Sequence, residues 1–125
     1  MKILIDSSVW IDYFKGGQNT LKLDSYIEQN LICVNDLILA ELVPFLKLKA
    51  QFHLVELLNK VDTSPLFVDW QKIIDYQTVA LRKGINKIGL PDLIILDNVI
   101  QNNLALYTLD KHFRLLKRHI HFELI

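Results

Sequence analysis

The feature that most constrains the fold is the stretch at residues 2–11, where an apolar run ends at a carboxylate. Ile-Leu-Ile at residues 3–5 is followed by Asp6, Ser7 and Ser8, and then by a second amphipathic segment. This pattern indicates a buried strand that brings Asp6 to the carboxyl edge of a sheet, where open α/β sheets bind ligands. Asp and Ser also accept hydrogen bonds from the free N–H groups of a helix, so a helix cap is an equally open interpretation of this stretch.

The remainder of the chain alternates between strand-like and helix-like segments. Apolar runs at 31–34, 104–108 and, more weakly, 120–125 predict strands, and the run at 61–68 contains Ser64-Pro65 and allows only a short edge strand. Helices are expected at residues 9–14, 19–29, 37–49, 51–60, 70–83, 90–102 and 111–118. Pro44 should kink or divide the third of these. The alternation predicts one three-layer α/β/α domain over residues 1–125, built on a parallel sheet.

Composition excludes several classes of protein. Lys plus Arg and Asp plus Glu each number 14, so no global positive field attracts nucleic acid or a membrane surface. The single Cys33 cannot form an internal disulfide, and it lies in an apolar run where we expect it to be buried. The chain has no membrane-span-length apolar run and no signal-peptide pattern at its start. We therefore expect a cytoplasmic protein that acts away from the membrane.

Four acidic residues are expected to meet near one edge of the sheet. Asp6 and Asp110 end strands, Asp92 begins a helix, and Glu41 lies one turn into the helix after the second strand. Two such charges 4 Å apart cost about 4 kcal/mol at an effective dielectric of 20, and a divalent cation would remove that cost. Oxygen ligands without clustered His or Cys favour Mg²⁺ or Mn²⁺ over zinc. These ions polarise phosphates, so the sequence predicts metal-assisted phosphodiester hydrolysis.

Two hydroxyl residues accompany these carboxylates. Asp6-x-Ser8 and Thr108-x-Asp110 place a hydroxyl two residues from each strand-end acid, where it can orient the carboxylate or a bound water. Each acid taken singly can also have a structural role. The Asp92 carboxylate can interact favourably with the positive end of a helix dipole, and Asp110 can cap the helix that starts at Lys111. Glu41 is the exception, because a carboxylate inside an apolar stripe is costly unless it is paired, metal-bound or exposed.

The order of these motifs resembles the PIN-domain ribonucleases, and more narrowly the VapC-type toxins of type II toxin–antitoxin pairs. The resemblance rests on four segments, which are Ile5-Asp6-Ser7-Ser8-Val9-Trp10-Ile11, Ala40-Glu41-Leu42, Pro91-Asp92-Leu93-Ile94-Ile95 and Tyr107-Thr108-Leu109-Asp110-Lys111-His112-Phe113. It implies a Mg²⁺- or Mn²⁺-dependent endoribonuclease with an acidic pocket at the edge of a five-stranded parallel sheet. By position, Asp6 and Asp92 match the principal metal ligands, Glu41 and Asp110 the other two acids, and Ser8 and Thr108 the hydroxyl positions.

The resemblance also implies partners. It implies a homodimer, a cognate antitoxin whose tail inserts near the active site, and transfer or ribosomal RNA as substrate. The antitoxin would use apolar grooves around the central helices. Because Pro44 follows Glu41 by three residues, a kink there can change the angle at which Glu41 enters the pocket.

Positive charge around an acidic pocket is needed to hold the phosphate backbone of RNA. Basic residues at helical spacing follow Asp110, and others precede Asp92; the candidates for RNA contact are Lys111, Arg114, Lys117, Arg82 and Lys87. Any of them can instead be a solvated helix charge. His112 is placed near the substrate, and the tryptophans and phenylalanines are interpreted as core residues.

Two other functions are consistent with part of this pattern. A phospho-acceptor signalling domain has this length and binds Mg²⁺, but no Asp lies between Leu37 and Val61, where its acceptor strand would supply one. A PIN-like module that binds RNA or protein without cutting is disfavoured because all four acidic positions are present. Phosphate-cradling glycine loops of either common spacing are absent.

Overall fold

The computed structural model describes residues 1–125. Its strands are β1 (Ile3–Ile5), β2 (Ile32–Cys33), β3 (Ala105–Tyr107) and β4 (Glu123–Leu124). They form one parallel sheet in the order β2-β1-β3-β4, with Ile3 opposite both Ile32 and Ala105, and Ala105 opposite Glu123. The helices are α1 (Ser7–Phe14), α2 (Leu23–Glu28), α3 (Asp36–Leu48), α4 (Phe52–Asn59), α5 (Trp70–Arg82), α6 (Leu90–Gln101) and α7 (His112–Lys117). The predicted α/β fold with a parallel sheet is confirmed.

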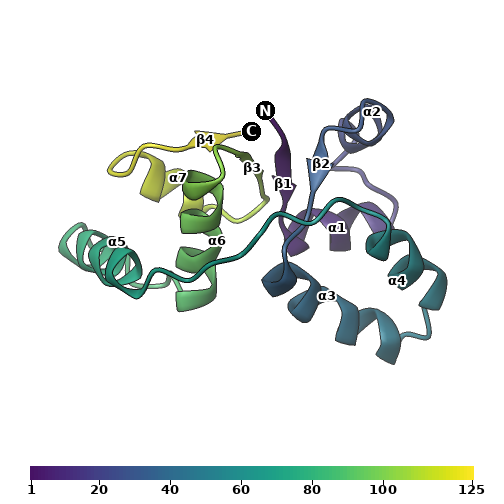
Figure 1. The fold of residues 1–125 in the computed structure, drawn as a ribbon, viewed down its shortest axis with the longest axis horizontal. Helices are drawn as coiled ribbons and strands as arrows, with labels where there is room; N and C mark the ends of the chain where they lie inside the picture. Colours follow the sequence, from purple (N-terminus) through teal and green to yellow (C-terminus); the bar gives the residue numbers. More distant parts are fainter.

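The helices flank the sheet in two groups. In Figure 1, α1 to α4 gather on the β2 side of the view and α5 to α7 on the β4 side. The central strands are almost fully buried, and Leu4, Ile5 and Leu106 have no exposed surface. Cys33 is buried as expected, and burial raises the pKa of its thiol to about 11. None of the helices is both long and apolar enough to cross a membrane.

The sheet has four strands rather than five. The segment at 61–68 makes only an isolated parallel bridge between Thr63 and Val34. The ladder stops there because Asn35, the residue after Val34, already caps α3, with its side-chain oxygen accepting from the Ile38 N–H at 2.9 Å. Pro65 also lacks a backbone N–H to donate.

Two helix expectations are corrected. Pro44 does not divide the third helix, since α3 runs from Asp36 to Leu48 with Pro44 inside it. Ile38, Leu42 and Leu46 are all buried, so one apolar face packs against the core on both sides of the proline. The second helix, α2, is shorter than the predicted 19–29. Asp12 accepts hydrogen bonds from the Asn19 N–H and the Thr20 hydroxyl, and these contacts hold the residues before α2 in a loop.

The aromatic residues divide between core and surface. Trp10 and Phe113 are buried, as expected. Trp70, Phe52 and Phe67 are 60%, 58% and 71% exposed, so the interpretation of all tryptophans and phenylalanines as core residues is wrong. Phe67 lies in the irregular segment before α5, and Trp70 opens that helix on its outer side. These side chains leave apolar surface open to a partner.

Candidate functional site

Asp6 lies at the carboxyl end of β1 and is 6% exposed. Its backbone N–H donates to the Tyr107 carbonyl at 3.0 Å, which fixes the end of β1 against β3. One carboxylate oxygen, Oδ1, accepts from the Ser7 N–H at 2.8 Å and so caps α1. The other, Oδ2, accepts from the Ser8 hydroxyl at 3.0 Å and the Thr108 hydroxyl at 2.8 Å. Asp6 is therefore both the helix cap and the centre of a hydroxyl cluster, and the two interpretations of this stretch hold together.

Ser8 and Thr108 join the ends of two strands that are about a hundred residues apart in sequence. Their oxygens lie 3.4 Å from each other. The Ser8 Oγ accepts from the Leu109 N–H at 3.1 Å, and the Thr108 Oγ1 accepts from the Asp110 N–H at 3.0 Å. The two hydroxyls therefore fix both the Asp6 carboxylate and the backbone that carries Asp110, in the arrangement that their spacing had suggested.

Asp110 is oriented by the residue two positions later. Its Oδ1 is 2.9 Å from the His112 backbone nitrogen, which donates to it, and 2.8 Å from the His112 Nδ1. Asp110 Oδ2 takes no hydrogen bond and remains free for a ligand. The contact of His112 with Asp110 was not predicted, although the Asp-x-His spacing is one at which an Asp carboxylate commonly accepts from the backbone two residues on.

Asp92 lies in the first turn of α6. Its Oδ2 accepts from the Gly89 N–H at 3.3 Å, which is a capping contact, and its Oδ1 has no hydrogen bond. Partial burial raises the pKa of Asp92, the Gly89 N–H opposes that rise, and the carboxylates of Asp110 and Asp6 add to it. Asp92 therefore stands in the electric field of both strand-end acids.

Glu41 reaches the same field from α3. It is exposed and makes no hydrogen bond. Loss of hydration raises its pKa first, followed by the negative charges of Asp6 and Asp92. All four predicted acids are therefore electrostatic neighbours, although no three Asp, Glu, His or Cys side chains are already arranged to hold a metal ion. The donor set fits Mg²⁺ or Mn²⁺, because it consists of carboxylate oxygens, several of them unpaired, whose mutual repulsion a cation would relieve.

Most of the basic candidates are free on the surface. Arg82, Lys87, Lys111 and Arg114 are exposed, and neither ion pair in the structure involves them. Lys117 is different, because its ammonium donates to the Phe122 carbonyl and lies 5.4 Å from the centre of the Phe122 ring. Lys117 is thus engaged in holding the C-terminal segment to α7.

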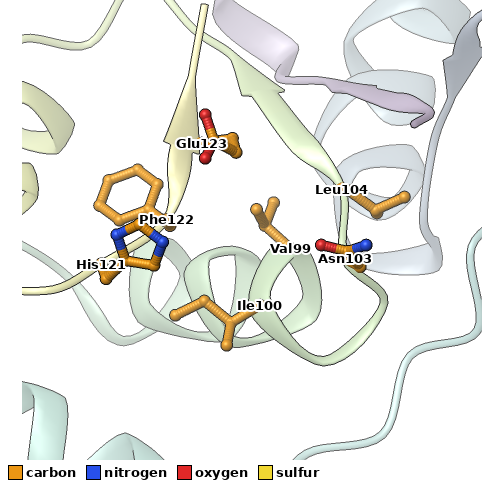
Figure 2. Close-up of a pocket in the computed structure, with 7 residues that line it drawn as sticks. All are labelled: Val99, Ile100, Asn103, Leu104, His121, Phe122 and Glu123. Atoms are coloured by element: carbon orange, nitrogen blue, oxygen red, sulfur yellow. The ribbon is translucent and has the colours of Figure 1, made fainter.

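The cavity drawn in Figure 2 does not contain any of the four acids. It has a volume of about 110 Å³ and lies between the end of α6, the start of β3 and the segment leading into β4. His121 and Glu123 lie beside it, but no metal-binding group forms there. The candidate site is instead the acidic cluster at the opposite, carboxyl edge of the sheet.

Comparisons with known proteins agree with this fold. The sequence matches the PIN domain family model over residues 3–118. The fold is similar to a chain of a DNA-bound VapBC complex from Salmonella typhimurium, with 16% identity and a TM-score of 0.76, over 100% of this chain and 97% of that one. It is also similar to a chain of a toxin–antitoxin complex from Klebsiella pneumoniae, with 24% identity and a TM-score of 0.62, over 88% of each chain. No curated protein matches the sequence significantly.

A parallel α/β sheet with acids gathered at its carboxyl edge defines the class of protein, and the family match covers nearly the whole chain. The chain belongs to the PIN domain family, as the order of its motifs had indicated. Its fold is shared with chains of solved toxin–antitoxin complexes.

Proposed function

We propose that this protein is a divalent-cation-dependent endoribonuclease and the toxin of a toxin–antitoxin pair. The observation that carries the proposal is the electrostatic coupling of four carboxyl groups at one edge of a PIN-domain sheet. The pKa of Asp92 is raised in part by Asp110 and Asp6, and that of Glu41 in part by Asp6 and Asp92. Such repulsion is a cost to the metal-free fold that a cation would offset.

Each acid has a distinct role in this proposal. Asp92 and Asp110 would hold Mg²⁺ or Mn²⁺ through the oxygens that take no hydrogen bond, together with Asp6, and Glu41 would complete the set. Ser8 and Thr108 keep Asp6 in one orientation through their hydrogen bonds to its Oδ2. A bound cation would polarise the phosphate and activate water for hydrolysis. The chain's contribution is to orient its carboxylates before the substrate arrives.

RNA would be held by the exposed cations next to this cluster. Arg82 ends α5 and Lys87 lies in the loop between α5 and α6, while Lys111 precedes α7 and Arg114 lies within it. Positive side chains in these places compensate the repulsion between a phosphate backbone and an acidic site. We propose transfer or ribosomal RNA as the substrate class, with Lys117 contributing less because it is bound to the C-terminal segment.

Protein partners are supported by apolar surface. Eight apolar residues line a cavity of about 240 Å³ among α1, α2 and α4, and Trp10, Phe14 and Leu57 are among them. We propose that a cognate antitoxin binds this region. We also propose that the protein forms a homodimer with a second copy of the chain. Toxin–antitoxin complexes among the structures of similar fold support the first of these.

The test is cleavage of a pool of transfer and ribosomal RNA by purified protein freed of antitoxin. We expect discrete fragments with Mg²⁺ or Mn²⁺ and none with chelator. Losing a residue that only supports a metal ligand lowers activity by up to about 100-fold. Asp92 is a proposed ligand itself, so Asp92→Asn should lower the cleavage rate by more than about 100-fold. Asp75→Asn is the matched control, since it removes the same charge from an exposed position on α5.

Two outcomes would contradict the proposal. Cutting by Asp92→Asn at the wild-type rate would show that the acidic cluster is not the active site. A folded protein that cuts none of these RNAs with either metal would favour a PIN-like module that binds RNA or protein without catalysis.

A further inference from the structure

Another cavity lies beside the acidic cluster, between the loop that joins α5 to α6 and the first turn of α7. Its volume is about 250 Å³, and it is lined by Gly84, Ile85, Asn86, Lys87, His112 and Leu115. Figure 1 shows α5, α6 and α7 together on the same side of the sheet. Loop and helix therefore enclose a space that neither element forms alone.

His112 connects this cavity to the acids. Its ring lines the cavity, and its Nδ1 lies 2.8 Å from Asp110 Oδ1. Its positive form would also lie near enough to Asp92 to lower the pKa of that carboxyl group. One side chain thus contacts both the cavity and Asp110. A nucleotide next to a phosphate held at the acids would reach this space.

The walls of the cavity suit an unpaired nucleotide. Ile85 and Leu115 offer apolar surface, and the His112 imidazole offers a flat ring for a base to stack on. Proteins recognise unpaired RNA by stacking bases on such side chains and by hydrogen bonds to the base edges. A small apolar ligand is disfavoured, because four of the six lining residues are polar or glycine.

Asn86 provides the group that could tell one base from another. Its side chain is exposed at the cavity and takes no part in any side-chain hydrogen bond of the structure. A carboxamide carries both donors and an acceptor, so it can pair with a base edge that presents the complementary pair. Lys87 adds a cation without an acidic partner, which suits the phosphate of the same nucleotide.

We propose that this cavity is a subsite for one unpaired nucleotide flanking the scissile bond, and that Asn86 sets a base preference there. The proposal rests on the proposed ribonuclease function and adds a determinant of substrate choice. It predicts that cleavage depends on the identity of one base at a fixed distance from the cut.

Binding is tested without catalysis, so that it does not depend on turnover. Protein in EDTA is titrated with RNA tetranucleotides of A, C, G or U while the Asn86 amide and Leu115 methyl signals are followed by NMR. We expect one tetranucleotide to shift both signals more than the other three. Asn86→Ala should weaken its binding about tenfold or more, and Asn59→Ala, an exposed Asn at the end of α4, should not.

Three results would overturn the subsite. They are the absence of shifts with every tetranucleotide, equal shifts with all four, and the same shifts with inorganic phosphate alone, which would reduce the cavity to a phosphate site. A second readout is the sequence at the fragment ends: Asn86→Ala should lose the preference at one position, and unchanged ends would also refute the proposal. Base-selective binding in a protein that never cuts would refute the proposed function and leave the subsite standing.

Discussion

Replacing Thr108 by Val tests whether the hydroxyl cluster holds the acidic site together. Thr108 is 8% exposed, and its hydroxyl donates to Asp6 Oδ2 at 2.8 Å while accepting from the Asp110 N–H at 3.0 Å. Valine has nearly the same shape, so the change leaves no cavity and replaces the hydroxyl with a methyl group that neither donates nor accepts a hydrogen bond. The Asp6 carboxylate and the Asp110 backbone N–H therefore each lose a hydrogen-bond partner through a single substitution.

The size of the effect follows from these two contacts. A hydrogen bond to a charged acceptor contributes about 1.5–3 kcal/mol and an ordinary one about 0.5–1.5, so we expect Thr108→Val to lower the free energy of unfolding by about 2–4 kcal/mol. This is a large share of the roughly 5–15 kcal/mol that holds a typical domain folded. The Ser8 hydroxyl cannot replace the contact, because it already donates to the same oxygen.

The assay is urea denaturation followed by circular dichroism, with Thr78→Val as the matched control. The Thr78 hydroxyl donates to the Ile74 carbonyl of its own helix at 2.8 Å, away from the site, so its loss should change stability by less than about 0.5 kcal/mol. Thr108→Val should also slow cleavage about 10–100-fold. If both variants are equally stable, the hydroxyl cluster does not support the fold as argued.

Two further predictions concern ionisation and buried polar contacts. Asp92 and Glu41 hold their protons more tightly folded than unfolded, since the pKa of each is raised above its ordinary value, 3.8 for Asp92 and 4.5 for Glu41. Ionising them therefore destabilises the metal-free fold, and in EDTA Asp92→Asn should gain stability relative to wild type as pH rises from about 3.8 to neutral; parallel pH curves would refute this. Asn98 has no exposed surface and links the Asn35 amide at 3.0 Å to the Pro65 carbonyl at 2.7 Å, so Asn98→Leu should cost about 2–4 kcal/mol in urea denaturation, against an unchanged Asn59→Ala.

The sequence was informative about the acidic cluster because strand ends are local features. An apolar run that stops at Asp6 or at Asp110 marks the end of a buried strand, whatever the rest of the fold does. Parallel strands then bring these ends to one edge of the sheet. Asp92, in the first turn of its helix, was placed by a helix start signal, the Pro91 that precedes it.

What the sequence did not predict depends on contacts between distant segments. The second helix is short because Asp12 in α1 accepts from the Asn19 N–H at 3.2 Å and from the Thr20 hydroxyl at 2.9 Å, which holds those residues in a loop. Lys117, a candidate for RNA contact, donates to the Phe122 carbonyl of the C-terminal segment. The cavity at Asn86 lies between the α5–α6 loop and α7. The distance between these two segments depends on the tertiary fold and is not encoded in any local sequence pattern.

The cap and the site prove to be two uses of the same carboxylates. Asp6 accepts from the Ser7 N–H, Asp92 from the Gly89 N–H and Asp110 from the His112 N–H, so each is held at or near the start of a helix. Backbone N–H groups there favour a negative charge, and this opposes the repulsion that gathering the acids creates. Each capping oxygen is fixed, while the second oxygen accepts from two hydroxyls in Asp6 and takes no hydrogen bond in Asp92 or Asp110. Asn caps a helix as well as Asp does, so Asp→Asn separates the two roles where Asp→Ala would remove both.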